Sequence, residues 1–406
     1  MSLIASPAAL LLAARGLRSF GDGLTSLVLP VYLLVLGYGP VATGTIATAT
    51  LLGSALLTIL VGVHGNRVHG RTLLLGAALL MAATGLVFAF VHDLWPLVIV
   101  AFVGTLNPSA GDVSVFLPLE QAELARTVRN EDRTRLFARY SFIGSVTGAV
   151  GALAAGLPEG AADLFGVEMK TALQSAFLVY AALGVAVFAI YGQLPRQPKR
   201  SAPAPRAHSL RQSRRPVLTL AALFSVDAFA GGFVVQSLLA LWLFERFSLS
   251  LATAGLIFFW TGLLSSFSYF VAARIAERIG LVNTMVFTHL PSNICLVLTA
   301  FAPTLWMAVA LLLLRSALSQ MDVPTRTSYV LAIVSPEERS AAVSVTAAPR
   351  SLAAAISPSL AGGLLAISSF GWPLLIAGTL KSVYDLLLFM LFRRARPPEE
   401  CDKEKM

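Results

Sequence analysis

Two stretches of this chain carry the same pattern. Residues 117–133 read LPLEQAELARTVRNEDR and residues 323–339 read VPTRTSYVLAIVSPEER, so Pro118 precedes Arg133 by the same interval that Pro324 precedes Arg339. The two stretches are 206 residues apart, and a second echo at an offset of 211 links Asn66-Arg67 to Glu277-Arg278. Two echoes at similar offsets predict that one structural unit is present twice.

The composition places most of the chain in a membrane. Of its 406 residues, 56% are hydrophobic and 13% charged, and the mean hydropathy of +0.77 excludes a soluble globule with a normal surface. Apolar runs of about 20 residues predict spanning helices, because β-barrel strands would be shorter and would alternate with polar residues. The predicted spans lie near residues 9–36, 41–63, 71–91, 95–122, 140–157, 171–192, 216–243, 251–273, 281–301, 304–333, 342–367 and 371–392.

The basic residues predict the orientation of these spans, because short cytoplasmic loops keep an excess of Lys and Arg. The predicted outward loops carry only Lys170 and Arg246. We therefore predict an all-α, multi-pass protein of the cytoplasmic (inner) membrane, with twelve transmembrane helices and both termini cytoplasmic. It would consist of an N-terminal six-helix bundle (1–192), a basic, proline-rich cytoplasmic linker (193–215), a C-terminal six-helix bundle (216–392) and a cytoplasmic tail (393–406).

Several function classes are disfavoured by the sequence. The pI near 9.9 comes from basic residues spread over cytoplasmic loops, so we expect membrane lipids as partners and no nucleic acid. The chain has no closed metal-site spacing, and its two cysteines form no disulfide framework. It lacks Gly-x-Ser-x-Gly, His-Glu-x-x-His and the phosphate-binding Gly-x-x-x-x-Gly-Lys. We expect a monomeric protein that is not an enzyme, holds no metal or other cofactor and does not use ATP.

Four aspartates interrupt the apolar runs at regular intervals. They lie in the first, fourth, seventh and tenth predicted spans, as Asp22, Asp112, Asp227 and Asp322. A carboxylate in hydrocarbon is costly, so it must face a partner, the protein interior or a water-filled cavity. The spacing predicts a polar path through the membrane that binds a small molecule or an ion.

The neighbours of these acids suggest different roles. Arg18 and Asp22 are four residues apart and can pair on one helix face, so Asp22 is either neutralised or a proton or substrate-cation site. Asp227 has no basic residue nearby on its own span, so its partner must come from another span, from water or from a proton. A buried carboxylate without a fixed countercharge can take up and release a proton near neutral pH.

The tenth and fourth spans contain further polar residues. Arg315 and Asp322 are two helical turns apart on one face, which fits a salt-bridge ladder or a transport role. Arg315 could bind an anionic group, because arginine stays charged. Asn107, followed by a proline, lies near the predicted midplane, where the freed carbonyl could bind a ligand or the proline could simply kink the helix.

Three more ionisable residues lie in the ninth and twelfth spans. Lys381 and Asp385 are four apart and are predicted to neutralise each other. His289 could relay protons, although a lone membrane histidine is more often a hydrogen-bonded packing residue.

The chain resembles the major facilitator superfamily. The family's signature turn, Gly-x-x-x-Asp-Arg-x-Gly-Arg, is similar to residues 62–71, GVHGNRVHGR, and its weaker second copy is similar to residues 273–280, ARIAERIG. The resemblance implies two pseudo-symmetric six-helix bundles whose first, fourth, seventh and tenth spans line a cavity. Asn66 replaces the acid of the family's cytoplasmic latch. The resemblance therefore implies a weaker cytoplasmic gate, or one that pairs Glu120 and Glu123 with Arg67 and Arg71, completed by Glu277, Arg278 and Arg326.

Together these features predict a secondary transporter that moves a small solute by alternating access, with the proton as coupling ion. Gly144, Gly148 and Gly151 resemble part of an exporter motif in the fifth span, which favours efflux by antiport, although tight helix packing explains them as well. A proton- or sodium-coupled uptake symporter and a divalent metal transporter remain alternatives. Outside transport, the alternatives are a membrane-embedded enzyme and a receptor.

Overall fold

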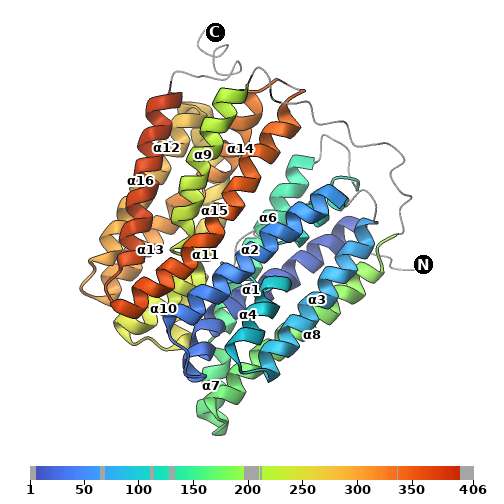
Figure 1. Cartoon of the computed structure of the whole chain (residues 1–406), viewed down its shortest axis with the longest axis vertical. Helices are drawn as coiled ribbons and strands as arrows, with labels where there is room; N and C mark the ends of the chain where they lie inside the picture. Colours follow the sequence, from blue (N-terminus) through green and yellow to red (C-terminus); the bar gives the residue numbers. More distant parts are fainter. Residues whose placement is uncertain are drawn as a thin grey trace. The chain divides into compact units, whose positions relative to one another are not determined.

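A computed structural model describes residues 6–64, 69–109, 114–127, 133–195, 210, 213–335 and 337–393. Helices make up the described chain, and no strand occurs in it (Figure 1). The helices of the first half are α1 (Pro7–Val35), α2 (Pro40–His64), α3 (Gly70–Phe90), α4 (Leu94–Val103), α5 (Phe116–Leu124), α6 (Arg133–Ala154), α7 (Leu157–Phe165) and α8 (Met169–Gly192). Those that follow are α9 (Arg214–Gly232), α10 (Gln236–Phe247), α11 (Leu251–Ile279), α12 (Leu281–Ala300), α13 (Leu305–Ser319), α14 (Asp322–Ala332), α15 (Arg339–Ile367) and α16 (Trp372–Phe392).

Nine helical stretches in the described residues are long and apolar enough to cross a membrane. The remaining predicted spans are the first, fourth and tenth. These are three of the four spans that carry the aspartates. Helix α1 is long enough but contains Arg15, Arg18 and Asp22, and the other two spans are each divided into two shorter helices, α4 with α5 and α13 with α14. The first span therefore falls short because of its charged residues, and the fourth and tenth because their helices are short.

The fourth and tenth predicted spans are interrupted, as is the seventh between α9 and α10. Helix α4 ends at Val103, and the chain then turns at Asn107-Pro108. The Asn107 side-chain oxygen accepts hydrogen bonds from the Ser109 backbone N–H (3.1 Å) and hydroxyl (2.7 Å). An Asx turn of this kind competes with the helical hydrogen bonds, and the proline lacks a donor, so the helix stops. In the tenth span, α13 ends before Gln320 and α14 begins at Asp322.

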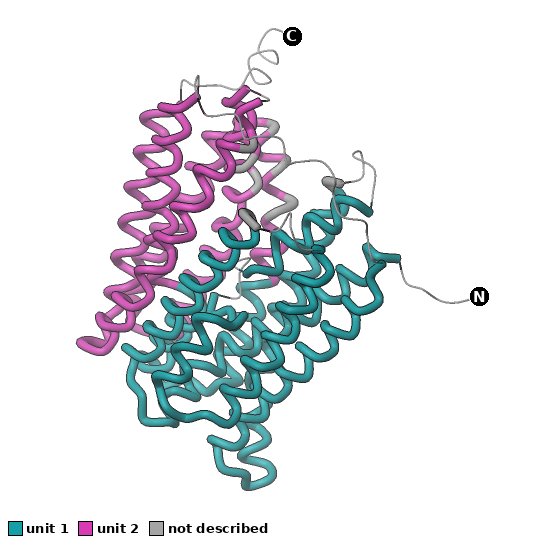
Figure 2. The backbone as a smooth tube through the Cα atoms, turned by 45° about the vertical axis from the view of Figure 1, so that its right-hand side comes forward, with its two compact units in different colours: residues 1–202, 235–262 teal, residues 203–234, 263–406 magenta. Residues whose placement is uncertain are grey.

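The chain divides into two compact units (Figure 2). Unit 1 comprises residues 1–202 and 235–262, and unit 2 comprises residues 203–234 and 263–406. Residues 235–262, which the sequence places in the second bundle, thus group with unit 1. Within unit 1, the Gln236 side chain of α10 donates a hydrogen bond to the Ser26 hydroxyl of α1 (3.0 Å), and the Ser237 backbone N–H donates to the Pro108 carbonyl (3.0 Å).

Small residues bring the helices of unit 1 close together. A Cβ added to Gly23 of α1 would overlap the Gly148 carbonyl of α6, and one added to Gly151 would overlap the Phe20 carbonyl. Gly144 leaves room for the Arg15 side chain. The glycines of the predicted exporter motif therefore have a packing role against α1 in this structure.

Aromatic and aliphatic side chains form the core of unit 2. They come chiefly from α9, α12, α14 and α16 and include Phe224, Met285, Tyr329, Tyr384 and Leu388, all nearly inaccessible to solvent. This core borders the polar groups described next, because the ring of Tyr384 packs against both Phe224 and His289.

Candidate functional site

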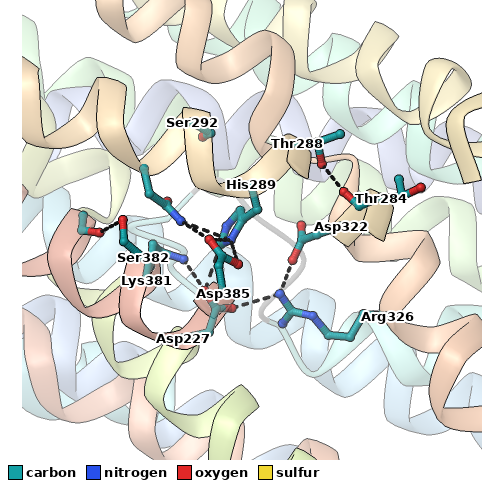
Figure 3. Close-up of polar contacts among 12 residues, drawn as sticks. Asp227, Thr284, Thr288, His289, Ser292, Asp322, Arg326, Lys381, Ser382 and Asp385 are labelled. Atoms are coloured by element: carbon teal, nitrogen blue, oxygen red, sulfur yellow. Dashed lines mark hydrogen bonds and ion pairs between the residues drawn. The ribbon is translucent and has the colours of Figure 1, made fainter. Parts of the chain in front are cut away.

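Unit 2 holds a cluster of buried ionisable side chains around Asp227 (Figure 3). The Asp227 carboxylate of α9 accepts hydrogen bonds from Lys381 Nζ of α16 (2.6 Å, to Oδ1) and from Arg326 Nη2 of α14 (2.9 Å, to Oδ2). The same Arg326 nitrogen also contacts Asp322 one turn earlier in α14. Each of these four side chains is at most 10% exposed. Two cations therefore hold Asp227 on opposite oxygens.

A second arm of this Asp227 cluster runs through His289 of α12. Its Nδ1 lies 2.9 Å from Asp385 Oδ1 of α16, and its Nε2 lies 4.0 Å from Asp227 Oδ1. Asn293, one turn further along α12, donates a hydrogen bond to Asp385 Oδ2 (2.8 Å). The imidazole thus lies between two carboxylates: Asp227, paired with Lys381 and Arg326, and Asp385, hydrogen-bonded to His289 and Asn293.

The observed contacts in unit 2 can be compared with the pairs predicted from sequence spacing. Asp227 does take its partners from other spans, as its isolation on its own span required. The prediction that Lys381 neutralises Asp385 was wrong, because the lysine hydrogen-bonds to Asp227 and the aspartate to His289. Asp322 pairs with Arg326 rather than with Arg315. Four-residue spacing thus holds for Asp322 and Arg326 within α14 but fails for Lys381 and Asp385, each of which has a closer partner on another helix.

Unit 1 contains a smaller buried cluster around Glu120 of α5. Its carboxylate accepts hydrogen bonds from Arg18 of α1, from the Tyr140 hydroxyl of α6 and from the Tyr191 hydroxyl of α8. The Arg18 guanidinium also lies over the Phe116 ring, 4.1 Å from its centroid. Four helices therefore meet at one carboxylate, whose side chain is inaccessible to solvent.

The Glu120 cluster bears on two of the expected pairings. The hydrogen-bonded partner of Arg18 is Glu120 rather than Asp22, although Asp22 is within electrostatic range of both Arg18 and Tyr180. The proposed gate pairs Glu120 and Glu123 with Arg67, which lies outside the described residues, and with Arg71, which donates instead to the carbonyls of Tyr191 (3.3 Å) and Gly192. Glu123 pairs with Arg126 at 2.9 Å.

The two clusters are related by the internal repeat with the charges exchanged. Glu120 and Arg326 occupy matching positions two residues after Pro118 and Pro324. Their partners, Arg18 and Asp227, come from the first spans of the two halves. The first half thus pairs a base in its first span with an acid in its fourth, and the second half reverses the signs.

The other predicted site residues belong to neither cluster or lie outside the described residues. Asp112, Asn66 and Arg67 lie outside the described residues, as does the side chain of Glu277. Arg278 is exposed, and Asn107 is buried in its turn. Arg315 has a buried Nε without a hydrogen-bond partner among the described residues. No group of three metal-binding side chains occurs in the described part of the chain.

Sequence reasoning missed four residues of these clusters. Tyr140, Tyr191 and Asn293 carry no charge, and nothing in a single sequence separates them from packing residues. Arg350 could have been found, because it is a charged residue well inside the apolar span Ala341–Ile367. It lies within electrostatic range of Arg326, Asp227 and Asp322.

Comparisons with known proteins agree with this architecture. The chain is 24% identical over 419 residues to Uncharacterized membrane protein YJR124C of Saccharomyces cerevisiae, an alignment that covers 94% of this chain and 93% of the yeast protein. Its fold is similar to a mutant form of the nucleoside transporter NupG (TM-score 0.77, 14% identity, covering 95% of this chain and 99% of that one). It is also similar to a bacterial homologue of the human lysosomal transporter Spinster, in an inward-facing and occupied conformation (TM-score 0.74, 14% identity, 96% and 97%).

A family model provides the assignment. The model described as Major Facilitator Superfamily matches residues 11–288 and 223–405, which together cover nearly the whole chain. The match includes both clusters and both copies of the repeated turn. The chain therefore belongs to the Major Facilitator Superfamily.

Proposed function

We propose that protons drive solute movement by this secondary transporter, and that the Asp227 cluster carries them. Membership of the family supports transport of a small molecule by alternating access. The observation that supports the proton is a pair of hydrogen-bonded groups of buried acids and bases on α9, α12, α14 and α16, which approach each other to 4.0 Å between His289 Nε2 and Asp227 Oδ1. Burying charged groups in a membrane is costly, and those that occur there usually have a function.

The geometry suggests how a proton would act. Histidine changes charge between about pH 5 and 8, and His289 lies between Asp385 and Asp227. A proton passed to Asp227 would remove its charge and leave Lys381 and Arg326 without their carboxylate. Because unpaired buried cations are strongly unfavourable, protonation would favour a conformation in which these cations find other partners. We propose that Asp22 in unit 1 contributes to the same exchange.

Two directions of transport are compatible with this chemistry. Export by proton antiport is our first candidate, from the resemblance of the glycines in α6 to an exporter motif. Uptake by proton symport is the second. The contacts of Asp227 favour it, because they argue against the exchange of a proton for a cationic solute at this carboxylate. Asp227 is already held by two internal cations, so a cationic solute would have to displace Lys381 or Arg326 before it could compete with a proton.

The test is transport in proteoliposomes that contain only this chain and an internal pH-sensitive dye. Solutes are first selected by the shift in unfolding temperature of the purified protein across pH. We expect solute-dependent proton movement, lost in Asp227→Asn and Asp22→Asn and retained in the exposed control Arg246→Gln. Proton and solute moving in opposite directions would identify antiport. Transport that is undiminished in both aspartate variants would refute the assignment.

The membrane topology belongs to the same proposal. We propose an inner-membrane monomer with both termini cytoplasmic, on the basis of the distribution of Lys and Arg. Impermeant labelling of single cysteines placed near Lys170 and Arg246 should succeed from outside intact cells, and labelling at residue 401 should not.

A further inference from the structure

Arg326 has hydrogen-bonding capacity that the Asp227 cluster does not use. Its Nη2 contacts Asp227 and Asp322, but its buried Nη1 and Nε have no partner among the residues that the structure describes. The buried Tyr384 hydroxyl likewise has none there, and the Tyr384 ring centroid lies 5.9 Å from Arg326 Cζ. Buried donors normally find acceptors, so these groups point to an acceptor that comes from outside the chain.

Arg350 of α15 adds a second guanidinium beside these groups. It lies within electrostatic range of Arg326 and Tyr384. It shares a helix face with Ser357, two turns further along, and the Ser357 hydroxyl donates a hydrogen bond to the Phe229 carbonyl of α9. Arg350 is therefore on the side of α15 that faces the helix carrying Asp227.

Arg350 also differs from the charged groups of the Asp227 cluster in its exposure. Its side chain is exposed although it lies well inside the apolar span Ala341–Ile367. An arginine at that depth is unfavourable against hydrocarbon and faces protein or a water-filled cavity instead. Unit 2 thus brings an exposed guanidinium, Arg350, within electrostatic range of a buried one, Arg326.

We propose that Arg350, Arg326 and Tyr384 bind an anionic group, a carboxylate or a phosphate, of the transported solute. The unused groups on the two arginines are N–H donors, and the planar guanidinium matches the oxygens of both anions. The rings of Phe224 and Tyr384, centred 5.0 and 5.9 Å from Arg326 Cζ, offer an apolar surface to the rest of the solute. The proposal rests on the proposed function in one respect, because it takes the bound anion to be part of the solute that the protein transports.

A cationic solute fits this part of unit 2 poorly. The Asp227 carboxylate is engaged by Lys381 and Arg326, and Asp322 by Arg326. An anion at Arg326 would instead draw the guanidinium away from Asp227 and make that carboxylate easier to protonate. Solute and proton would then bind cooperatively, by the reciprocity that applies to any two linked ligands.

The test uses the purified full chain in detergent and four probes built on one ring: benzoate, phenyl phosphate, benzamide and benzylamine. At equal ionic strength, we expect benzoate or phenyl phosphate to raise the unfolding temperature and the other two probes not to do so. The anion that binds distinguishes a carboxylate from a phosphate site. Arg350→Gln should weaken its affinity at least about tenfold and Tyr384→Phe should weaken it less, whereas Arg246→Gln should leave it unchanged.

Three results would overturn the proposal: equal shifts with benzamide or benzylamine, unchanged anion affinity in Arg350→Gln, or no shift with either anion. Because Arg350 is exposed, its replacement should not prevent folding. The outcome is separable from proton coupling. Anion binding without solute-dependent proton movement would support this site and refute proton coupling. Solute-dependent proton movement without anion binding would support proton coupling and refute this site.

Discussion

Replacement of Glu120 by glutamine should destabilise the chain by about 3–5 kcal/mol, the usual cost of breaking a buried ion pair. The Glu120 side chain is inaccessible to solvent and accepts hydrogen bonds from Arg18, Tyr140 and Tyr191. Glutamine has one acceptor oxygen and no charge, so at least one donor loses its acceptor. The Arg18 side chain, 2% exposed, would remain as a buried cation without its counterion.

The assay is reversible denaturant titration of the purified chain in detergent, applied to Glu120→Gln, Arg18→Met and the double variant. Because each single change leaves the other partner buried and unsatisfied, the double variant should be less destabilised than the sum of the two, by about 2 kcal/mol. Glu123→Gln is the matched control in the same helix, since its partner Arg126 is 42% exposed. That pair should contribute less than about 1 kcal/mol.

Two outcomes would refute this reasoning. Glu120→Gln could prove no more destabilising than Glu123→Gln, or the effects of Glu120→Gln and Arg18→Met could add without coupling. In either case the buried pair would not hold the four helices of unit 1 together.

Three further predictions concern the Asp227 cluster and the packing of the helices. Asp227→Asn should abolish transport driven by a pH gradient in proteoliposomes, because it removes the charge that holds Lys381 and Arg326, whereas Asp227→Glu should retain part of it; a wild-type rate in the asparagine variant would contradict this. His289→Gln keeps a hydrogen-bonding group beside Asp385 but cannot pass a proton between the two carboxylates, so proton-coupled transport should fall while solute binding persists. An unchanged transport rate would remove His289 from the proton path. Gly23→Ala should destabilise the chain by about 1–3 kcal/mol, because the new Cβ would overlap the Gly148 carbonyl. The control Gly76→Ala, with no described atom within 4 Å of its Cβ, should be neutral or stabilising by up to about 1 kcal/mol. Equal effects of the two substitutions in denaturant titration would show that close packing of α1 and α6 does not matter.

The sequence by itself determined the class and most of the architecture. Hydrocarbon requires every backbone group to be satisfied inside its own segment, so long apolar runs can only be helices. The repeat was also visible, because residues 117–133 and 323–339 carry the same pattern, and this pattern aligns Glu120 with Arg326. The cost of charge in a membrane singled out Asp227 and Asp322, both of which lie in the cluster of unit 2.

Only the tertiary structure decided which charges meet. Within one helix, a spacing of four residues made Arg18 with Asp22 and Lys381 with Asp385 equally reasonable pairs. The structure instead joins Arg18 to Glu120 and Lys381 to Asp227, residues 102 and 154 positions apart. The reason is that long basic side chains reach across helix interfaces, where a buried carboxylate contacted from several helices is better compensated than one paired along its own helix. Spacing along the chain therefore does not predict which charged residues pair across helices.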